Sequence, residues 1–540
     1  MTLKGQIKKT IEILSGNKCE VYAKWEHENY LADGEIVSNF WDLVERAISI
    51  TIIGDYDVDG ICASYIMASS VKNVFPDKKI RIRIPKRFSE GYGIKDSIID
   101  EIREKDHKGT LIITVDNGIA AGEKLEILEK EGYTVAITDH HMLANKRIPK
   151  VSFVLNPTVE DGASLCSGDY WCGAGVALKL TEQYVDEQTK ANSEVFAGIA
   201  TIADCVPLKE GNWALVRKAI KSIRKGKAPS QIITLLTALN QDPAFCNEDT
   251  IGYYLAPAMN APGRLYDNGG AMVVKYLISP DLEKALALAQ INDERKKLRD
   301  EQYKQILEII KANGIESNCP IWVEADNLHE GIIGILAGKV SEDFGVPSIV
   351  LTELNNGLLK GSARTAGDIH ILNYLLNCGA NFVELGGHAG AAGMTISKTE
   401  FDIAKEFQIE KPKTVDAEIE FINISTEDIP EAYKELSKYM PFGEGNPTPL
   451  FTVQIDISAD EVRMVGDNTQ HLIAVDKAQN WKVTHFHHRP NNLEDKMRFY
   501  IGGPISIQGF NHIGVPTLNG EIAFDIFEGK EMNDLEKQNI

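Results

Sequence analysis

Residues 48–60 have the sequence ISITIIGDYDVDG, in which an apolar run ends in three closely spaced aspartates. The run is rich in β-branched residues and is bounded by glycine, which predicts a buried strand over residues 48–54. Apolar residues at helical spacing from residue 61 to about 74 predict that a helix follows. Asp55, Asp57 and Asp59 are therefore expected in the turn at the carboxyl end of a strand.

Strands and helices continue to alternate as far as residue 155. Further strands are predicted at residues 80–84, 111–115, 134–137 and 151–155, with a helix at about 122–131. This alternation predicts parallel βαβ units and a doubly wound α/β sheet. In such a sheet the loops at the carboxyl ends of the strands converge on one crevice. Asp116 follows the strand at 111–115, and Asp139, His140 and His141 follow the strand at 134–137.

A fourth acidic position, Asp204, ends an apolar helical stretch that could fold over the same crevice. An isolated DxD motif is more often a turn or a helix cap, but acidic and histidine residues after three strands favour one shared site. Carboxylates and imidazole without thiolate suit Mn²⁺ or Mg²⁺ and also allow Zn²⁺. Because neighbouring carboxylates repel one another unless cations lie between them, we expect two ions with Asp116 as the bridging ligand. The pattern predicts metal-dependent phosphoester hydrolysis.

The bulk properties limit the class of protein. The chain has 540 residues and a formal net charge of −21. An acidic balance argues against nucleic-acid binding, yet it does not say where basic residues gather, and it counts aspartates that bound ions would neutralise. No apolar run approaches the roughly 18 residues of a membrane helix, and the N-terminus lacks a signal peptide's apolar region. We therefore expect a cytoplasmic protein without membrane contact, and its scattered cysteines argue against a disulfide framework.

The sequence pattern changes twice in the second half of the chain. Residues 281–312 contain neither proline nor glycine and have apolar residues at helical spacing, which predicts a long helix between domains. The α/β pattern resumes at residue 320, and frequent glycine and proline after residue 411 predict a small all-β domain. Two α/β domains beside the long helix would form a narrow cleft between them.

Several segments resemble, in order, the motifs of the DHH phosphoesterase superfamily. The catalytic-domain motifs are matched by GDYDVDG (54–60), VDNGI (115–119), TDHH (138–141) and IADCVPL (202–208). The associated DHHA1 domain is resembled by HEGIIGILAGKV (329–340), KGSART (360–365) and GGHAGAAG (386–393). Within the superfamily the chain resembles the RecJ family through IPKRFSEGYGI (84–94), MNAPGRL (259–265) and PFGEGNPTPLF (441–451). The resemblance covers nearly the whole chain.

The resemblance implies a domain order and a set of metal ligands. The implied domains are an N-terminal extension (1–45), the DHH catalytic domain (46–210), a helical region with the connecting helix (211–312), the DHHA1 domain (313–410) and an OB-like domain (411–540). The implied ligands are Asp57, Asp59, Asp116, His140 and Asp204, with Asp55 as a candidate sixth. Other DHH branches have a histidine four residues before the middle aspartate of the first motif. Here that position is Ile53, and Asp55 is expected to substitute.

The resemblance also assigns residues to catalysis and to substrate binding. Asp116, His140 and His141 are implied in catalysis, with His141 contacting the scissile phosphate or orienting a ligand. Asp139 is expected to hold a histidine tautomer. The residues implied in nucleic-acid binding are Arg87, Arg264, Ser362, Arg364 and His388. Arg87, Ser362 and Arg364 are implied to hold a 5′-terminal phosphate and so to set directionality.

The implied function is a metal-dependent 5′→3′ exonuclease that degrades single-stranded DNA to mononucleotides in repair and recombination. A monomer is expected, with a single-stranded-DNA-binding protein and a helicase as possible partners. One alternative is a DHH-type oligoribonuclease or cyclic-dinucleotide phosphodiesterase, against which the segment after residue 441 argues. A second is a non-catalytic DNA-binding replisome scaffold, which would be expected to lack ligands. A third is a soluble inorganic pyrophosphatase, which has no need of an OB-like domain.

Overall fold

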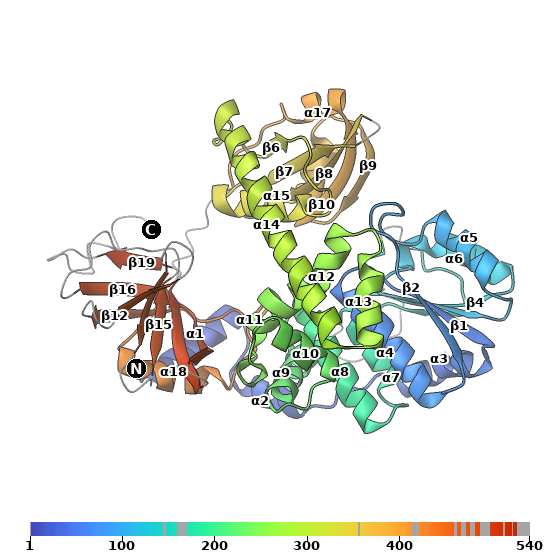
Figure 1. The fold of residues 1–540 in the computed structure, drawn as a ribbon, viewed down its shortest axis with the longest axis horizontal. Helices are drawn as coiled ribbons and strands as arrows, with labels where there is room; N and C mark the ends of the chain where they lie inside the picture. Colours follow the sequence, from blue (N-terminus) through green and yellow to red (C-terminus); the bar gives the residue numbers. More distant parts are fainter. Residues whose placement is uncertain are drawn as a thin grey trace.

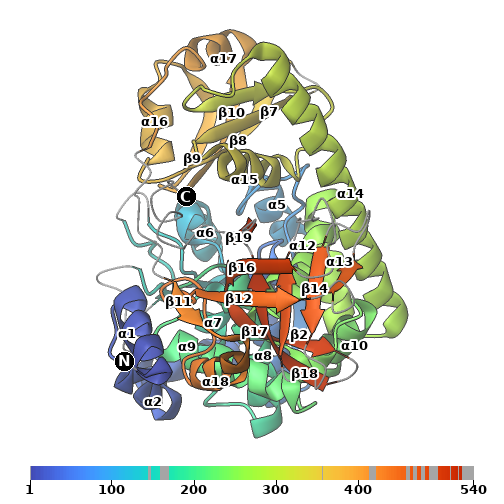
Figure 2. The ribbon, with the colours of Figure 1, turned by 90° about the vertical axis from the view of Figure 1, so that its left-hand side faces the viewer.

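The structure is a computed structural model. It describes residues 2–143, 147–158, 170–354, 357–412, 421–457, 462–465, 471–475, 481–485, 497–510, 513–520 and 522–525. The long helix α14 (Leu282–Asn313) joins a first α/β domain to a second one above it, and a β-rich domain lies on the other side of the helical region (Figures 1 and 2). None of the helices that the structure describes has both the length and the apolar character needed to cross a membrane.

The first domain is built on five parallel strands in the order β2-β1-β3-β4-β5. The strands are β1 (Ser49–Ile53), β2 (Lys79–Arg83), β3 (Leu111–Val115), β4 (Thr134–Thr138) and β5 (Phe153–Leu155). The connecting helices are α3 (Gly34–Arg46), α4 (Val58–Val74), α5 (Asp96–Lys105) and α6 (Gly122–Lys130). Alternate residues of β3 face opposite sides, because Leu111 and Ile113 pack with α3 and α4 whereas Ile112 packs with α5 and α6. The predicted doubly wound sheet is confirmed.

The helical region covers the carboxyl end of this sheet. Its helices are α7 (Gly173–Thr181), α8 (Glu187–Ala203), α9 (Glu210–Arg224), α10 (Ser230–Ala238), α11 (Glu248–Thr250), the π-helix η3 (Ile251–Leu255), α12 (Ala256–Leu265) and α13 (Gly269–Ile278). Helix α14 begins at the cap Asp281, which accepts from the Lys284 amide, and ends at Gly314 in the left-handed conformation. At 1.5 Å per residue its 32 residues span about 48 Å. Its first half packs into the core of the first domain and its second half into that of the second.

The second α/β domain has a five-stranded mixed sheet in the order β6-β7-β8-β10-β9. Its elements are β6 (Ile321–Glu324), α15 (Ile333–Phe344), β7 (Ser348–Glu353), β8 (Leu358–Arg364), α16 (Ile371–Asn377), β9 (Phe382–Gly387), β10 (Ala391–Ser397) and α17 (Lys398–Ala404). Only the pair β6 and β7 is parallel among the pairs described here. Helix α15 packs on β7 and β8. A Cβ at Gly331, just before α15, would lie 1.8 Å from the Arg264 carbonyl oxygen, so this end of the helix faces the first domain.

The C-terminal part consists of two sheets, β11-β12-β16-β19 and β13-β14-β15-β18-β17. Its elements are β11 (Ile422–Ile424), α18 (Ile429–Leu436), β12 (Phe451–Ile457), β13 (Val462–Val465), β14 (His471–Val475), β15 (Lys482–His485), β16 (Met497–Gly503), β17 (Ile505–Phe510), β18 (Ile513–Gly520) and β19 (Ile522–Asp525). The predicted strand-rich C-terminal domain is confirmed, with the helix α18 added to it.

The N-terminal helices α1 (Leu3–Ser15) and α2 (Glu20–His27) pack with this C-terminal domain. Their buried residues share one hydrophobic core with Trp213 of α9 and with α18. The Trp213 indole N–H donates to the Tyr439 carbonyl at 2.9 Å, and Tyr22 donates to the Asn446 side chain at 2.7 Å. This core therefore fixes the C-terminal domain to the helical region.

Replacing Trp213 with alanine tests that attachment. Trp213 is fully buried, so Trp213→Ala should cost about 3–5 kcal/mol through lost contacts and a residual cavity. The measurement is urea unfolding followed by circular dichroism, in the transition that includes this core. Ile278→Ala, at a side chain that is 60% exposed, is the control and should change stability by no more than about 0.5 kcal/mol. Equal effects of the two variants would contradict the attachment.

Candidate metal centre and arginine cluster

The acidic residues gather where the strand order of the first sheet reverses. Strands β1 and β3 are neighbours, but the helices that follow them, α4 and α6, pack on opposite faces, so the loops after the two strands diverge and leave a crevice. Asp55 and Asp57 follow β1, and Asp116 follows β3. Asp116 has a φ of 58°, a left-handed conformation that is uncommon for non-glycine residues and is found often at functional sites.

Helix α7 holds the third aspartate of the first motif. Asp59 accepts hydrogen bonds from the Gly173 and Ala174 amides at 2.6 and 2.7 Å, at the N-terminus of that helix. The positive end of the helix dipole stabilises the ionised carboxylate there. Glycine is required at 173, because a Cβ at that position would lie 2.5 Å from the Cβ of Asp116.

His140 lies at the centre of the acidic residues. Its Nε2 is 3.0 Å from Asp116 Oδ1, 3.5 Å from Asp59 Oδ2 and 3.7 Å from Asp204 Oδ2. Asp204 is the C-cap residue of α8, which brings it over the crevice as predicted from its place after an apolar helix. Burial lowers the pKa of His140, which favours the neutral imidazole that a metal ion requires.

Asp139 and His141 form a separate pair beside this centre. Asp139 Oδ1 lies 2.8 Å from His141 Nδ1 and also accepts from the His140 amide, while its Oδ2 accepts from the Ile119 amide. Burial raises the pKa of Asp139, but the hydrogen bond with His141, the charge of His141 and the backbone amides together outweigh it and the net shift is downward. Burial opposes the charged form of His141, but the same hydrogen bond, together with the charges of Asp139, Asp55 and Asp204, raises the His141 pKa to about 9. The Tyr92 hydroxyl lies 3.2 Å from His141 Nε2.

These side chains fit divalent cations. Three groups each place their ligand atoms within 4.8 Å of one another: Asp116, His140 and His141; Asp59, His140 and Asp204; and Asp55, Asp57 and Asp116. Asp116 and His140 each belong to two of the groups, which suits a bridged pair of ions. Asp116 Oδ1 is buried and, although His140 Nε2 lies 3.0 Å away, it takes part in no well-directed hydrogen bond among the described residues. All six predicted ligands lie together, and which of them bind an ion stays a prediction.

Ile53, where other DHH branches have a histidine, lies outside this group of candidate ligands. The Ile53 side chain is fully buried on the face of the sheet covered by α5 and α6, in a core with Ile98 and Ile112. Asp55 lies two residues later and points into the crevice, within one of the candidate ligand groups.

The charge of the centre predicts how cation binding depends on pH. Burial and then repulsion from Asp57 raise the Asp55 pKa to about 8, and burial and then Asp59 raise the Asp204 pKa to about 8. A carboxyl must lose its proton to bind a metal ion, so Mn²⁺ affinity should rise between pH 6 and 8, and binding should release protons. Isothermal titration calorimetry in buffers of different ionisation heat measures this release. Affinity that is independent of pH would contradict it.

The same pKa shifts make the stability of the metal-free protein depend on pH. Raised pKa values mean that the folded state binds more protons than the unfolded state between about pH 4 and 8. Their contribution to stability is therefore present at low pH and is lost as the pH rises through 8. Added Mn²⁺ should restore stability at pH 8, because it takes the place of the protons. A thermal unfolding series over pH, with and without Mn²⁺, provides the measurement.

Four arginines gather between the two α/β domains, and we call them the arginine cluster: Arg87, Arg264, Arg295 and Arg364. Burial and then repulsion from the other three lower the pKa of Arg264 to about 10. No carboxylate in the described part of the chain forms an ion pair with any of them. The guanidinium of Arg87 lies 4.7 Å from the centre of the Tyr56 ring, beside the metal centre. Unpaired buried guanidinium groups are suited to bind phosphate.

The second domain contributes to the cluster through strand β8 and helix α15. Arg364 Nη1 donates to Ser362 Oγ at 2.9 Å, and a Cβ on Gly334 near the start of α15 would lie 2.7 Å from Arg364 Nη2. The predicted Ser362 and Arg364 therefore lie together with the predicted Arg87 and Arg264. Arg295 was not predicted, because it is one of many charged residues in a helix without a motif. The predicted His388 is exposed in the β9–β10 turn and bonds to Gly390 and Ala391. This turn borders the end of β8, where Ala391 is paired with Arg364.

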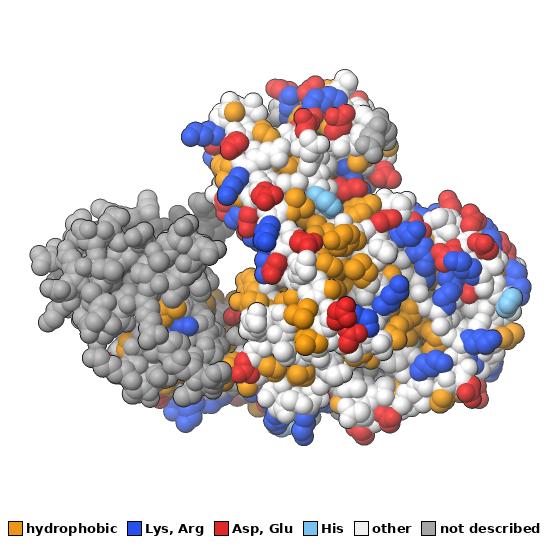
Figure 3. All heavy atoms as spheres, in the orientation of Figure 1, with side chains coloured by type: hydrophobic (Ala, Val, Ile, Leu, Met, Phe, Trp, Pro, Cys, Tyr) orange, Lys and Arg blue, Asp and Glu red, His pale blue; other side chains and the backbone are white. Residues whose placement is uncertain are grey.

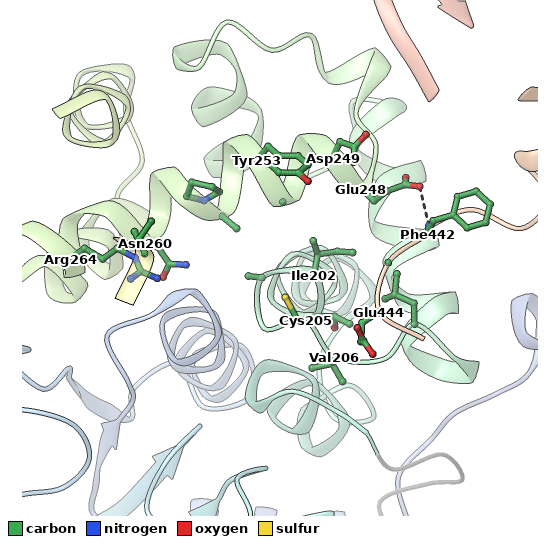
Figure 4. Close-up of a pocket in the computed structure, with 18 of the residues that line it drawn as sticks. Ile202, Cys205, Val206, Glu248, Asp249, Tyr253, Asn260, Arg264, Phe442 and Glu444 are labelled. Carbon is green, nitrogen blue, oxygen red and sulfur yellow. Dashed lines mark hydrogen bonds between the residues drawn. The ribbon is translucent and has the colours of Figure 1, made fainter. Parts of the chain in front are cut away.

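A groove of about 510 Å³ leads away from the metal centre. One end is lined by Arg264, Arg295 and Asn260, whose side chain accepts from the Val58 amide in the first motif. The other end is lined by Phe442 and Glu444, at the entry to the C-terminal domain (Figure 4). The groove thus runs from beside the first motif to the entry of the β-rich domain.

Comparison with known proteins defines the class. The model of the DHH family, N-terminal domain, matches residues 49–206, that of the DHHA1 domain matches 318–411, and that of the RecJ OB domain matches 415–519. The chain therefore belongs to the DHH family. The third match and the curated relatives place it in the RecJ group of that family.

The relatives are similar over most of this chain. The single-stranded-DNA-specific exonuclease RecJ of Bacillus subtilis is 30% identical over 498 residues, which are 88% of this chain and 62% of that protein. The RecJ of Escherichia coli is 27% identical over 403 residues, 68% of this chain and 67% of that protein. This chain spans less than two thirds of the length of the B. subtilis relative. The structure of Thermus thermophilus RecJ in complex with Mn²⁺ has the same fold, with a TM-score of 0.70, 22% identity, and coverage of 91% of this chain and 71% of that one.

Proposed function

We propose that this protein is a metal-dependent 5′→3′ exonuclease that hydrolyses single-stranded DNA to mononucleotides, in repair and recombination. The observation that carries the proposal is the placement of the unpaired arginine cluster directly beside the carboxylate and histidine centre. A centre that binds cations next to a centre that binds anions suits a phosphodiester whose end is held while the bond beside it is cut. The curated relatives are named as single-stranded-DNA-specific exonucleases, which agrees with this substrate.

Two Mn²⁺ or Mg²⁺ ions, when bound, would supply an activated water and a counter-charge for the leaving oxygen. Asp57, Asp59, Asp116, His140 and Asp204 would hold them, with Asp55 as a sixth ligand. The chain's own groups then position the substrate. His141, with its raised pKa and its link to Asp139, is placed to donate a hydrogen bond to the scissile phosphate. Arg87, Arg264, Arg295 and Arg364, with Ser362, would hold the terminal 5′-phosphate.

Selectivity for single strands over duplexes would come from the size of the site and from its local charge. On the face in Figure 3, Lys and Arg side chains are interspersed with Asp and Glu, and hydrophobic side chains gather over the middle of the helical region. The cationic groups that matter in the proposal are instead the partly buried arginines between the domains. A duplex is wider than a single strand and would be excluded from a site enclosed in this way.

Digestion of an end-labelled oligonucleotide tests the activity. A single strand with a 5′-phosphate should yield labelled mononucleotide at once from a 5′ label and only at the end from a 3′ label, with Mn²⁺ or Mg²⁺ present. Asp116→Asn removes the ligand shared by two candidate groups and should lower kcat at least ~100-fold, as loss of a transition-state contact does. Asp96→Asn, in an exposed ion pair with Lys124, is the control.

The alternatives give different results in the same assay. Faster cleavage of dinucleotides than of long strands would favour the oligoribonuclease or cyclic-dinucleotide phosphodiesterase. Binding of single-stranded DNA without cleavage under any metal would favour the non-catalytic scaffold. An unchanged rate in Asp116→Asn would exclude the proposed centre.

The arginine cluster predicts a dependence on the 5′ end. Removing Arg364 deletes a charge-assisted hydrogen bond of about 1.5–3 kcal/mol, so Arg364→Ala should raise KM for a 5′-phosphorylated strand by roughly 10-fold or more. The KM for a strand with a 5′-hydroxyl should change little. The control is Arg103→Ala, which removes an exposed arginine paired with Glu131. Equal losses on the two substrates would mean that Arg364 does not contact the terminal phosphate.

The oligomeric state, the partners and the location of the protein follow from the proposed substrate. We propose that the protein acts as a monomer in the cytoplasm, on strands supplied by a helicase and covered by a single-stranded-DNA-binding protein. The support is the proposed substrate alone, since such strands arise during repair and recombination. Light scattering of the purified protein and copurification from cells are the direct tests.

A further inference from the structure

One wall of the groove contains a rare backbone conformation. Helices α11 and α12 are joined without interruption by the π-helix η3 (Ile251–Leu255). Short π-helical turns cost hydrogen-bond geometry and occur often at functional sites. Within η3 the side chain of Tyr253 is 73% exposed although it lines the groove, and that of its neighbour Tyr254 is 40% exposed and outside it. The π-turn therefore places one aromatic ring at the groove and not the other.

Apolar side chains face this ring across the groove. Figure 4 shows Tyr253 on the helix that forms one wall, with Ile202, Cys205 and Val206 on the facing wall. Ala256 and Pro257 continue the first wall toward Asn260 and Arg264. Seven residues of helix separate Tyr253 from Asn260, or about 10 Å along the axis. The ring thus lies between the end of the groove at Asn260 and Arg264 and its end at the C-terminal domain.

The charges along the groove indicate how a strand would face this wall. The inner end has Arg264 and Arg295, whereas the outer end has Glu248, Asp249 and Glu444. Phosphates are attracted to the inner end and repelled by the outer end. A strand that follows the groove outward must therefore turn its phosphates toward solvent and its bases toward the wall at Tyr253.

We propose that Tyr253 is a binding residue on which a nucleobase stacks a few nucleotides behind the reacting 5′ end. The inference rests on the proposed function, because it assumes that the groove takes single-stranded nucleic acid. Every base has a π-face, so stacking on tyrosine grips a strand without selecting its sequence. This is the property that an exonuclease needs in order to advance along any strand.

The test compares Tyr253→Ala with Tyr254→Ala and Tyr253→Phe. The probe is a 5′-phosphorylated oligo(dT), with Ca²⁺ in place of Mn²⁺ to slow cleavage, and affinity is measured by fluorescence anisotropy. Stacking of one base contributes enough that Tyr253→Ala should weaken binding roughly 10-fold. Tyr253→Phe keeps the ring and Tyr254→Ala keeps Tyr253, so both should bind like the wild type. Thermal unfolding of each variant checks that the fold is intact.

A single abasic site, moved stepwise from the 5′ end of the probe, identifies the contact. The wild type should lose affinity when the abasic site reaches one internal position, and Tyr253→Ala should show no loss at that position. A phosphorylated dinucleotide, which is too short to reach Tyr253, should bind equally to the wild type and to Tyr253→Ala.

The outcomes separate this inference from the proposed function. If the wild type cuts single strands but Tyr253→Ala binds the probe normally, the inference is wrong and the proposed function stands. If the dinucleotide loses as much affinity as the long probe, Tyr253 acts through the metal centre and the inference is again wrong. If the wild type does not bind or cut single strands, the proposed function itself fails.

Discussion

The site depends on one constraint. Carboxylates that repel one another are buried where the strand order of the parallel sheet reverses. Asp55, Asp59, Asp116 and Asp139 are each almost fully buried. Asp59 accepts from two amides of α7, and Asp139 accepts from three amides and lies 2.8 Å from His141 Nδ1. Asp116 Oδ1 takes part in no well-directed hydrogen bond among the described residues, and burial followed by repulsion from Asp59 and Asp57 raises the Asp116 pKa well above the usual range. Hydrogen bonds therefore fix the positions of Asp59 and Asp139, whereas the charge of Asp116 is left for a cation to compensate.

The arginine cluster gathers positive charge beside the negative charge of the metal centre. Helix α14 belongs to the cores of both α/β domains, so it fixes the distance between β8, which carries Arg364, and α12, which carries Arg264. Contacts across the boundary support that distance, including Phe88 with His329 at 5.5 Å between ring centres. Guanidinium groups held together without carboxylates are costly unless an anion joins them. A phosphate at the cluster and cations at the metal centre relieve both costs at once, which makes the two clusters halves of one site.

The sequence predicted the fold best where one physical signal was strong. The strands of the first sheet are continuous apolar runs, and β3 was predicted at its observed limits because both of its faces are buried. The helix α5 (Asp96–Lys105) was not predicted, since its three buried isoleucines stand among charged residues and give a weak apolar pattern. The metal-centre residues could be grouped because they directly follow strands. Arg295 could not, because only the packing of α14 against α12 shows that it lies beside Arg264.

A net charge of −21 is compatible with a strand of DNA because the charges that decide binding are local. At physiological ionic strength the Debye length is about 8 Å, so an acidic side chain on the far surface contributes little to the potential at the arginine cluster. Within the groove the sign changes from basic at Arg264 and Arg295 to acidic at Glu248 and Glu444. A uniformly basic groove would hold phosphates equally along its length and would resist movement of the strand. In the proposed function, a groove that is basic only at its inner end would attract the terminal phosphate to the metal centre and would leave the following nucleotides to be held by their bases.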